Sequence, residues 1–168
     1  MYLETDRLIL TEFTLDMAQA VHENSLDADN RRFVPDEVFE TAEEARETIA
    51  FLMSRYGGNE GPFVYPLIMK KNEANIGYVQ LVPVAEGWEI GYHIAKEYTG
   101  NGYAAEAVRA FLPQIMKKHQ LKQVYGICLA DNLASRRVME KCGFQKLYEG
   151  PGNYQGKESS LCRYLFTA

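Results

Sequence analysis

Two glycines, Gly100 and Gly102, stand in a turn where a strand-like segment gives way to an alanine-rich helical segment. We expect the strand to cover Glu89 to Ile94 and the helix to begin at Tyr103. The first N–H groups of a helix have no intrahelical partner, and they lie at the positive end of the helix dipole. Because glycine has no Cβ, an anion can approach this main chain closely. The turn therefore predicts a binding site for a phosphate or pyrophosphate group.

The run from Gly100 to Ala105 also fits G-x-G-x-x-A, the fingerprint of dinucleotide-binding domains. That fingerprint belongs to a βαβ unit with an acidic residue about 20 positions further on. Lys122 and Gln123 occupy that distance here, and too few elements follow Leu129 for a second nucleotide-binding half. We therefore favour a different phosphorylated cofactor.

A second motif, DNLASRRVMEKCGF, runs from Asp131 to Phe144 between a predicted strand and a short predicted helix. Asn132 stands at the junction, and asparagine is one of the best helix N-caps. A capping residue is thus one interpretation. The other is that the Asn132 amide, which can both donate and accept, contacts the ligand of the glycine turn upstream.

Hydrophobic periodicity and turn residues predict the elements that position these groups. Thr41 and Glu44 form a capping box at the start of one helix, whose apolar face includes Met53. Segments 27–40 and 150–160 are polar and rich in turn formers, so we expect loops there. The expected strands are residues 7–11, 63–69, 76–82, 88–94, 124–129, 145–149 and 161–166, and the expected helices are 15–23, one opened by Thr41, 103–119 and 134–141. This order predicts a single α+β domain over residues 1–168 with a mixed sheet.

Composition and charge argue against several classes of protein. The net charge of −5 and a pI near 5.3 disfavour nucleic-acid binding. No segment has the roughly 20 apolar residues of a membrane span, and the N-terminus lacks the basic and apolar run of a signal peptide. Cys128, Cys142 and Cys162 are too widely spaced for a zinc site. We therefore expect reduced thiols, no bound metal, no membrane contact and a cytoplasmic location.

Together the two motifs resemble those of the GCN5-related N-acetyltransferase (GNAT) superfamily, in particular its branch of ribosomal-protein N-terminal (RimJ/RimL-like) acetyltransferases. ETDRLIL near the N-terminus, EIGYHIAKEYTGNGYAAEAV from Glu89 and DNLASRRVMEKCGF from Asp131 carry the resemblance, which covers nearly the whole chain. It implies the GNAT fold, a mixed sheet of about seven strands flanked by about four helices. It also implies acetyl transfer from acetyl-CoA, the cosubstrate, to a primary amine.

The resemblance places coenzyme A along the glycine turn and the preceding strand. The family's loop reads Q/R-x-x-G-x-G/A, and this chain departs from it only at Thr99, so main-chain donors are expected to bind the phosphates. The family's strand usually carries a bulge whose N–H polarises the thioester carbonyl, and we place that donor between Tyr92 and Ile94. The residues expected to contact the cofactor are Tyr92, Ile94, Gly100, Asn101, Gly102, Tyr103, Ala104, Ala105, Asn132 and Ser135.

The acceptor amine must be neutral to attack, while a lysine-like amine has a pKa of about 10.4. Glu89 is the first candidate for the base, because it shares a strand face with His93 and burial would raise its pKa toward a useful range. His93 is the second candidate, since imidazole titrates in that range. The alternatives are a structural or substrate-binding carboxylate at Glu89 and a packed strand histidine at His93.

The departing thiolate needs a proton or at least a hydrogen bond. Many relatives use a tyrosine at the position of Met139, and methionine cannot replace it. Ser135 lies four residues earlier on the same helical face and is the candidate in the branch that this chain resembles. First-turn capping of the helix is the alternative for Ser135.

The acceptor is the least defined part of the prediction. In this fold the segments 27–40 and 149–160 frame it, and a protein N-terminus or a small-molecule amine would fit equally well. A noncatalytic coenzyme A-binding module is the alternative function, because it would need the glycine turn but no base. The chain is expected to be a monomer or a homodimer, the latter through its last strand, Leu161–Phe166.

Overall fold

The computed structural model describes all 168 residues and contains one sheet of eight strands in the order β1-β2-β3-β4-β5-β6-β8-β7. Every neighbouring pair is antiparallel except β5 and β6, so the sheet is mixed as expected. The additional strand is β1, a two-residue segment at the N-terminal edge. The strands are β1 Leu3–Glu4, β2 Leu8–Leu10, β3 Phe63–Met69, β4 Asn75–Val84, β5 Gly87–Ile94, β6 Gln123–Leu129, β7 Gln145–Tyr154 and β8 Lys157–Thr167.

Five α-helices and three short 3-10 turns connect the strands. The helices are α1 Ala18–Ser25, α2 Ala28–Phe33, α3 Ala42–Arg55, α4 Tyr103–Lys118 and α5 Leu133–Lys141, and the 3-10 turns are η1 Leu15–Met17, η2 Pro35–Glu37 and η3 Lys96–Tyr98. The helix that the sequence did not predict is α2, inside the segment expected to be a loop. Asp27 caps it, because its Oδ1 accepts a hydrogen bond from the Asn30 N–H at 2.9 Å.

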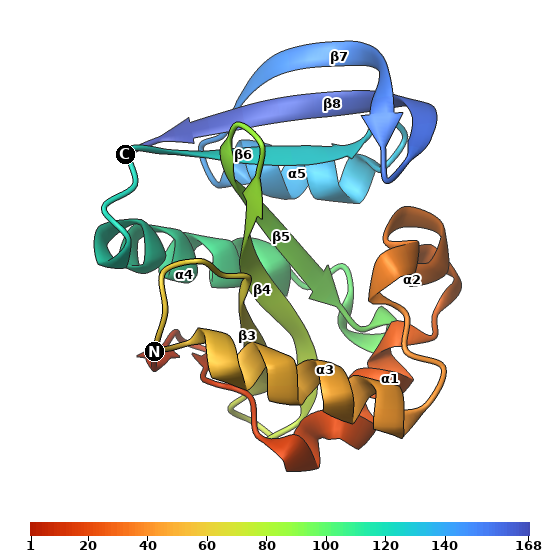
Figure 1. Cartoon of the computed structure of the whole chain (residues 1–168), viewed down its shortest axis with the longest axis vertical. Helices are drawn as coiled ribbons and strands as arrows, with labels where there is room; N and C mark the ends of the chain where they lie inside the picture. The colour runs from red at the N-terminus through yellow and green to blue at the C-terminus, as the bar shows by residue number, and fades with distance from the viewer.

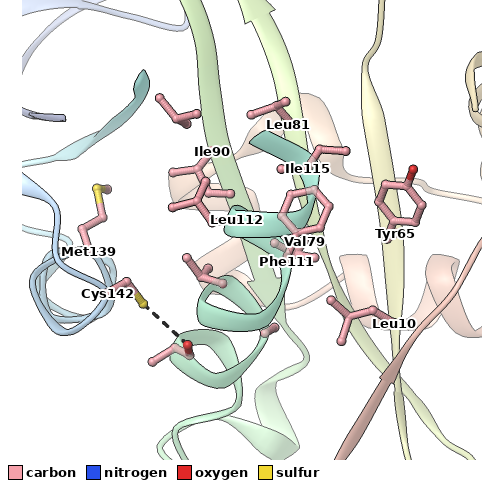
Figure 2. Packing of buried hydrophobic residues seen from close by; sticks show 14 of the residues in the cluster. Leu10, Tyr65, Val79, Leu81, Ile90, Phe111, Leu112, Ile115, Met139 and Cys142 are labelled. Atoms are coloured by element: carbon pink, nitrogen blue, oxygen red, sulfur yellow. Dashed lines mark hydrogen bonds between the residues drawn. The ribbon is translucent and has the colours of Figure 1, made fainter. Parts of the chain in front are cut away.

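Helices cover both faces of the sheet (Figure 1), with α4 and α5 on one face and α1 and α3 on the other. The larger core lies under α4, where Phe111, Leu112 and Ile115 pack against sheet residues that include Ile90 (Figure 2). On the other face, a smaller cluster joins α1 and α3 to β3. The expected apolar face of α3 is confirmed at its buried positions but wrong at Met53, whose exposed fraction is 39%.

The hairpin of β7 and β8 is longer than the sequence predicted. The strands continue through most of the segment expected to be a turn and meet at Gln155 and Gly156, both with positive φ. Pro151 lies within β7, where proline is tolerated because β7 is the edge strand of the sheet. The turn of the hairpin is thereby carried outward toward α2 (Figure 1). The expectation that Leu161–Phe166 could pair across a dimer is wrong, because β8 is paired on both edges, with β6 and with β7.

The sheet divides between β5 and β6. These two parallel strands pair only at Glu89 and Tyr125, whereas β4 and β5 keep a regular register from Gly77–Ile94 to Val84–Gly87. The prediction of a bulge between Tyr92 and Ile94 is wrong, because the register of β5 with β4 shows no shift there. The free edge of β5 arises instead because β6 runs off in another direction (Figure 1).

None of the helices combines the length and the apolar character needed to cross a membrane. No three His, Cys, Asp or Glu side chains are grouped so that they could hold a metal ion. The three cysteines are buried and unpaired.

Candidate functional site

A cavity of about 760 Å³ opens where β5 separates from β6. One side is walled by the glycine turn and the starts of α4 and α5, and the facing side by α2, η2, β4 and the tip of the β7–β8 hairpin. All the expected site residues except Asn101 line it, namely Glu89, Tyr92, His93, Ile94, Gly100, Gly102, Tyr103, Ala104, Ala105, Asn132 and Ser135. Residues from both faces of β5 thus meet in one space.

The glycine turn has the geometry that its sequence predicts. Gly100 and Gly102 have φ of +79° and +81°, the left-handed region that favours glycine. The backbone N–H groups of residues 100–105 donate to no protein acceptor, and a Cβ built at Gly100 would meet no atom within 4 Å. The hydroxyl of Thr99 donates to the Lys96 carbonyl at 2.8 Å and is used inside the turn. The turn therefore offers main-chain donors facing open space.

Asn101 supports the turn rather than the cavity. Its side-chain amide donates to the carbonyls of Tyr98 and Thr99, both at 3.1 Å, which directs it back into the turn. Its own carbonyl accepts from Arg7 Nη1 at 3.0 Å. The expected contact of Asn101 with a cofactor is thus restricted to its N–H.

Arg7 holds the turn in place, and the sequence did not reveal this. Its Nε donates to Glu106 Oε2 at 2.7 Å, and its guanidinium stacks 4.3 Å from the centre of the Tyr103 ring. Thr5 Oγ1 also donates to Glu106, at 2.6 Å. Burial opposes ionisation of Glu106, but the hydrogen bonds from Thr5 and Arg7 outweigh it and lower the pKa of that carboxyl. The N-terminal segment therefore fixes the first turn of α4.

Asn132 and Ser135 form the opposite wall at the start of α5. Asn132 Oδ1 accepts from the Ser135 N–H at 3.1 Å, so the capping interpretation of Asn132 is confirmed. The Asn132 side chain also lines the cavity. The Ser135 hydroxyl lies 2.9 Å from the Tyr92 hydroxyl, which is also 2.9 Å from the Ser135 carbonyl. Burial raises the pKa of Tyr92, so this hydroxyl stays protonated.

Met139, which replaces the usual tyrosine, is a core residue. It is 2% exposed, and its Sδ lies where a Cβ at Gly126 would approach within 2.5 Å. Figure 2 shows Met139 on α5, one turn before Cys142. The Sγ of Cys142 donates to the Ala105 carbonyl at 3.5 Å and so links α5 to α4. A tyrosine hydroxyl does reach the first turn of α5 at the cavity, but it belongs to Tyr92 of β5.

Glu89 points to the face of β5 away from α4, together with Gly91 and His93. Burial raises the pKa of its carboxyl to about 7; Arg163 opposes the shift, while Glu37 and Glu86 add to it. Arg163 is paired with Glu86 at 3.5 Å, and its charge also acts on Glu89. Glu89 thus has the pKa of a proton acceptor that works near neutral pH.

His93 is held differently from Glu89. Its Nε2 lies 3.4 Å from Asp27 Oδ2, and the ring is tilted against Tyr78 with centroids 5.8 Å apart. Burial lowers the pKa of His93, with Asp27 acting in the opposite direction. His93 is therefore a neutral, packed ring beside the N-cap of α2, which favours Glu89 over His93 as the stronger base candidate.

Segments 27–40 and 149–160 meet at the cavity, where α2 also contacts the η3 turn that precedes the glycine turn. The Tyr154 hydroxyl donates to the Phe33 carbonyl at 2.9 Å, and Lys96 pairs with Asp29 at 2.8 Å. Gln80 of β4 donates from Nε2 to Glu37 Oε1 at 2.8 Å. Glu37 and Gln80 were not singled out from the sequence, because only their meeting across 43 residues distinguishes them from other surface polar residues.

Comparisons with known proteins agree with this geometry. Residues 7–145 match the model of the Acetyltransferase (GNAT) domain family. The chain is 32% identical over 148 residues to the uncharacterized N-acetyltransferase YnaD of Bacillus subtilis, covering 87% of this chain and 84% of YnaD. A GNAT-family acetyltransferase from Bacillus anthracis has a TM-score of 0.83 and 26% identity, covering 99% of this chain and 98% of that one.

A further solved structure is that of RimL, a ribosomal L7/L12 alpha-N-protein acetyltransferase in complex with coenzyme A. Its TM-score is 0.81 and its sequence identity is 17%, and the match covers 99% of this chain and 98% of RimL. RimL therefore shares the fold of this chain. The match to the family model covers most of the chain and includes the glycine turn, β5 and the Asn132 motif. The chain belongs to the GNAT acetyltransferase family.

Proposed function

We propose that the protein transfers the acetyl group of acetyl-CoA to a primary amine by direct attack within a ternary complex. The observation that carries this proposal is the single cavity that joins the unpaired N–H groups of residues 100–105 to the carboxyl of Glu89. A phosphorylated cosubstrate fits the first end and an amine fits the second. Family membership and the coenzyme A complex of RimL support the same assignment.

The residues of the turn fit a pyrophosphate. Its N–H donors face open space at Gly100, and the dipole of the 16-residue helix α4 adds positive potential there. The edge of β5 beyond Glu89 has no strand partner, so an extended chain with amide groups can pair with it as an added strand. Donors on this edge, between Tyr92 and Ile94, would polarise a thioester carbonyl without any bulge.

Glu89 acts as the base. With a pKa near 7, its carboxyl is largely ionised at pH 7.5 and takes the proton that the amine must lose. The amine then forms the C–N bond as the C–S bond breaks, and the electron pair of that bond leaves with sulfur. Cys128 is the one cysteine that lines the cavity, but it is 2% exposed and burial raises the pKa of its thiol to about 12, so it would not carry the acetyl group covalently.

Ser135 supplies the hydrogen bond that the departing sulfur requires. The Tyr92 hydroxyl donates to the Ser135 carbonyl and can accept from Ser135 Oγ, which holds the serine hydroxyl at the cavity wall until it turns toward the departing sulfur. A thiol with a pKa near 8.5 is a fair leaving group, so the hydrogen bond from Ser135 contributes less to the rate than the base does. Tyr92 is accordingly a positioning residue for Ser135.

Replacing Ser135 with alanine is expected to lower kcat about tenfold, because it removes the hydrogen bond to the charge that develops at sulfur. Tyr92→Phe should lower kcat about threefold, because it removes the group that holds the Ser135 hydroxyl. The double variant should be no worse than Ser135→Ala, since Tyr92 acts through Ser135. Single-turnover rates with acetyl-CoA provide the measurement. Additive losses in the double variant would contradict a shared pathway.

The proposal is tested by release of free thiol from acetyl-CoA in the presence of a panel of amines at pH 8, combined with calorimetry of coenzyme A binding. We expect binding and amine-dependent thiol release. Coenzyme A binding without release for any amine would favour a noncatalytic binding module. Absence of binding to the folded protein would overturn the assignment altogether.

A further inference from the structure

Four carboxylates line the acceptor side of the cavity, those of Asp27, Asp29, Glu37 and Glu89. Asp29 is paired with Lys96, and Asp27, beside the neutral His93, accepts the N-cap hydrogen bond of α2. Glu37 is in no ion pair, and Arg163, whose charge acts on Glu89, is paired with Glu86. A partly buried carboxylate without a counter-ion lowers stability, so such groups commonly serve a ligand.

Glu37 is held in this place by a specific arrangement. Gln80 stands opposite Gly91 in the β4–β5 register and donates from Nε2 to Glu37 Oε1 at 2.8 Å. A Cβ at Gly91 would come within 2.6 Å of Gln80 Nε2, so only glycine leaves room for the amide to lie across β5. The second oxygen of Glu37 accepts no protein hydrogen bond. Glu37 therefore lines the cavity with one carboxylate oxygen left free to accept from a ligand.

Glu37 and Glu89 are near neighbours in the cavity. Gly91 and Glu89 lie on the same face of β5, two residues apart, and Gln80 stands opposite Gly91 and holds Glu37. The charge of Glu37 also raises the pKa of Glu89, so the two carboxylates are within electrostatic reach of each other. A short alkyl diamine can therefore place one nitrogen at each carboxylate.

We propose that the preferred acceptor carries two cationic groups, and that Glu37 binds the one that is not acetylated while Glu89 receives the reacting amine. The inference rests on the proposed acetyltransferase function and narrows its substrate class. A bound ammonium supplies the counter-ion that Glu37 lacks, whereas an alkyl group in the same position would leave the carboxylate buried without compensation. Glu37 is thus a specificity-determining residue rather than a catalytic one.

The test compares 1,5-diaminopentane with n-pentylamine, which have the same carbon chain and differ only in the second ammonium. Thiol release gives kcat/KM for each amine, with the diamine value halved for its two equivalent nitrogens. We expect at least about a tenfold preference for the diamine, carried mainly by KM. In Glu37→Gln the preference should fall below about threefold, while pentylamine changes less than about twofold.

Two further variants sharpen the result. Gln80→Met keeps the side-chain length but removes the amide that holds Glu37, so it should give an intermediate preference. Glu47→Gln removes an exposed carboxylate on α3 and should keep the full preference. If wild-type protein acetylates both amines equally well, or if Glu37→Gln slows both by the same factor, the inference is overturned and the acetyltransferase assignment stands. If no amine releases thiol, the assignment itself fails and the inference falls with it.

Discussion

Glu89→Gln is expected to lower kcat/KM for the acceptor amine about 100-fold at pH 7.5, the lower end of what a general base contributes. Glutamine keeps the size of the side chain but cannot accept a proton. The affinity for coenzyme A should stay within about twofold, because Glu89 lies near the start of β5, whereas the glycine turn follows the end of that strand. Steady-state rates and calorimetry on the same preparation measure the two quantities.

The pH profile carries the sharper test. In wild-type protein kcat/KM should rise with pH through about 7, because Glu89 accepts a proton only when its carboxyl is ionised. Four groups on other elements face it: Glu37 on η2, Glu86 in the turn before β5, Tyr154 on β7 and Arg163 on β8. In Glu89→Gln this limb should disappear, and activity should recover toward pH 10 as the free amine itself loses its proton.

Glu86→Gln is the matched control. Glu86 raises the pKa of Glu89 and competes for Arg163, so removing its charge should shift the acidic limb to lower pH without changing the plateau rate. The two carboxylates are three residues apart, and the substitution is chemically identical. If the Glu89→Gln profile kept the limb near pH 7, the base would be another group, with His93 the next candidate.

The parts of the site that sequence reasoning located are those fixed by local rules. Gly100 and Gly102 stand next to a helix start, and the helix itself leaves the neighbouring N–H groups unpaired. Glu89 follows from two-residue alternation along a strand, which assigns its face without knowledge of the partner. The absence of the usual tyrosine at Met139 could also be recognised from the sequence, because a motif with fixed spacing shows which position departs from it.

The parts that sequence reasoning missed depend on contacts between distant segments. The pairing of Arg7 with Glu106 spans 99 residues, and the Tyr92–Ser135 hydrogen bond spans 43. Segment 27–40 contains several acids, and only the position of η2 beside β4 shows that Glu37 points inward. Local patterns reveal which residues are charged, but topology decides which of them share a cavity.

Gly100→Asp is expected to weaken coenzyme A binding at least about 100-fold, equivalent to about 2.7 kcal/mol. The residue has φ of +79° and faces open space, so a side chain added there enters the volume that the pyrophosphate would occupy. Aspartate tolerates left-handed backbone better than most residues, which limits the cost to folding. Its carboxylate also opposes the phosphates and competes for the N–H donors of the turn.

Gly100→Asn separates the charge from the volume, because asparagine has the same shape and the same tolerance of positive φ. We expect Gly100→Asn to weaken coenzyme A binding about tenfold. The additional loss of affinity in Gly100→Asp then measures the repulsion between carboxylate and phosphate. This additional loss should become smaller in high salt. Gly156→Asp is the control for backbone strain, since Gly156 also has φ of +79° and no atom within 4 Å but lies at the hairpin turn. Equal effects of Asp at positions 100 and 156 would mean that the glycine turn does not hold the phosphates, and the site would have to be sought elsewhere on the cavity wall.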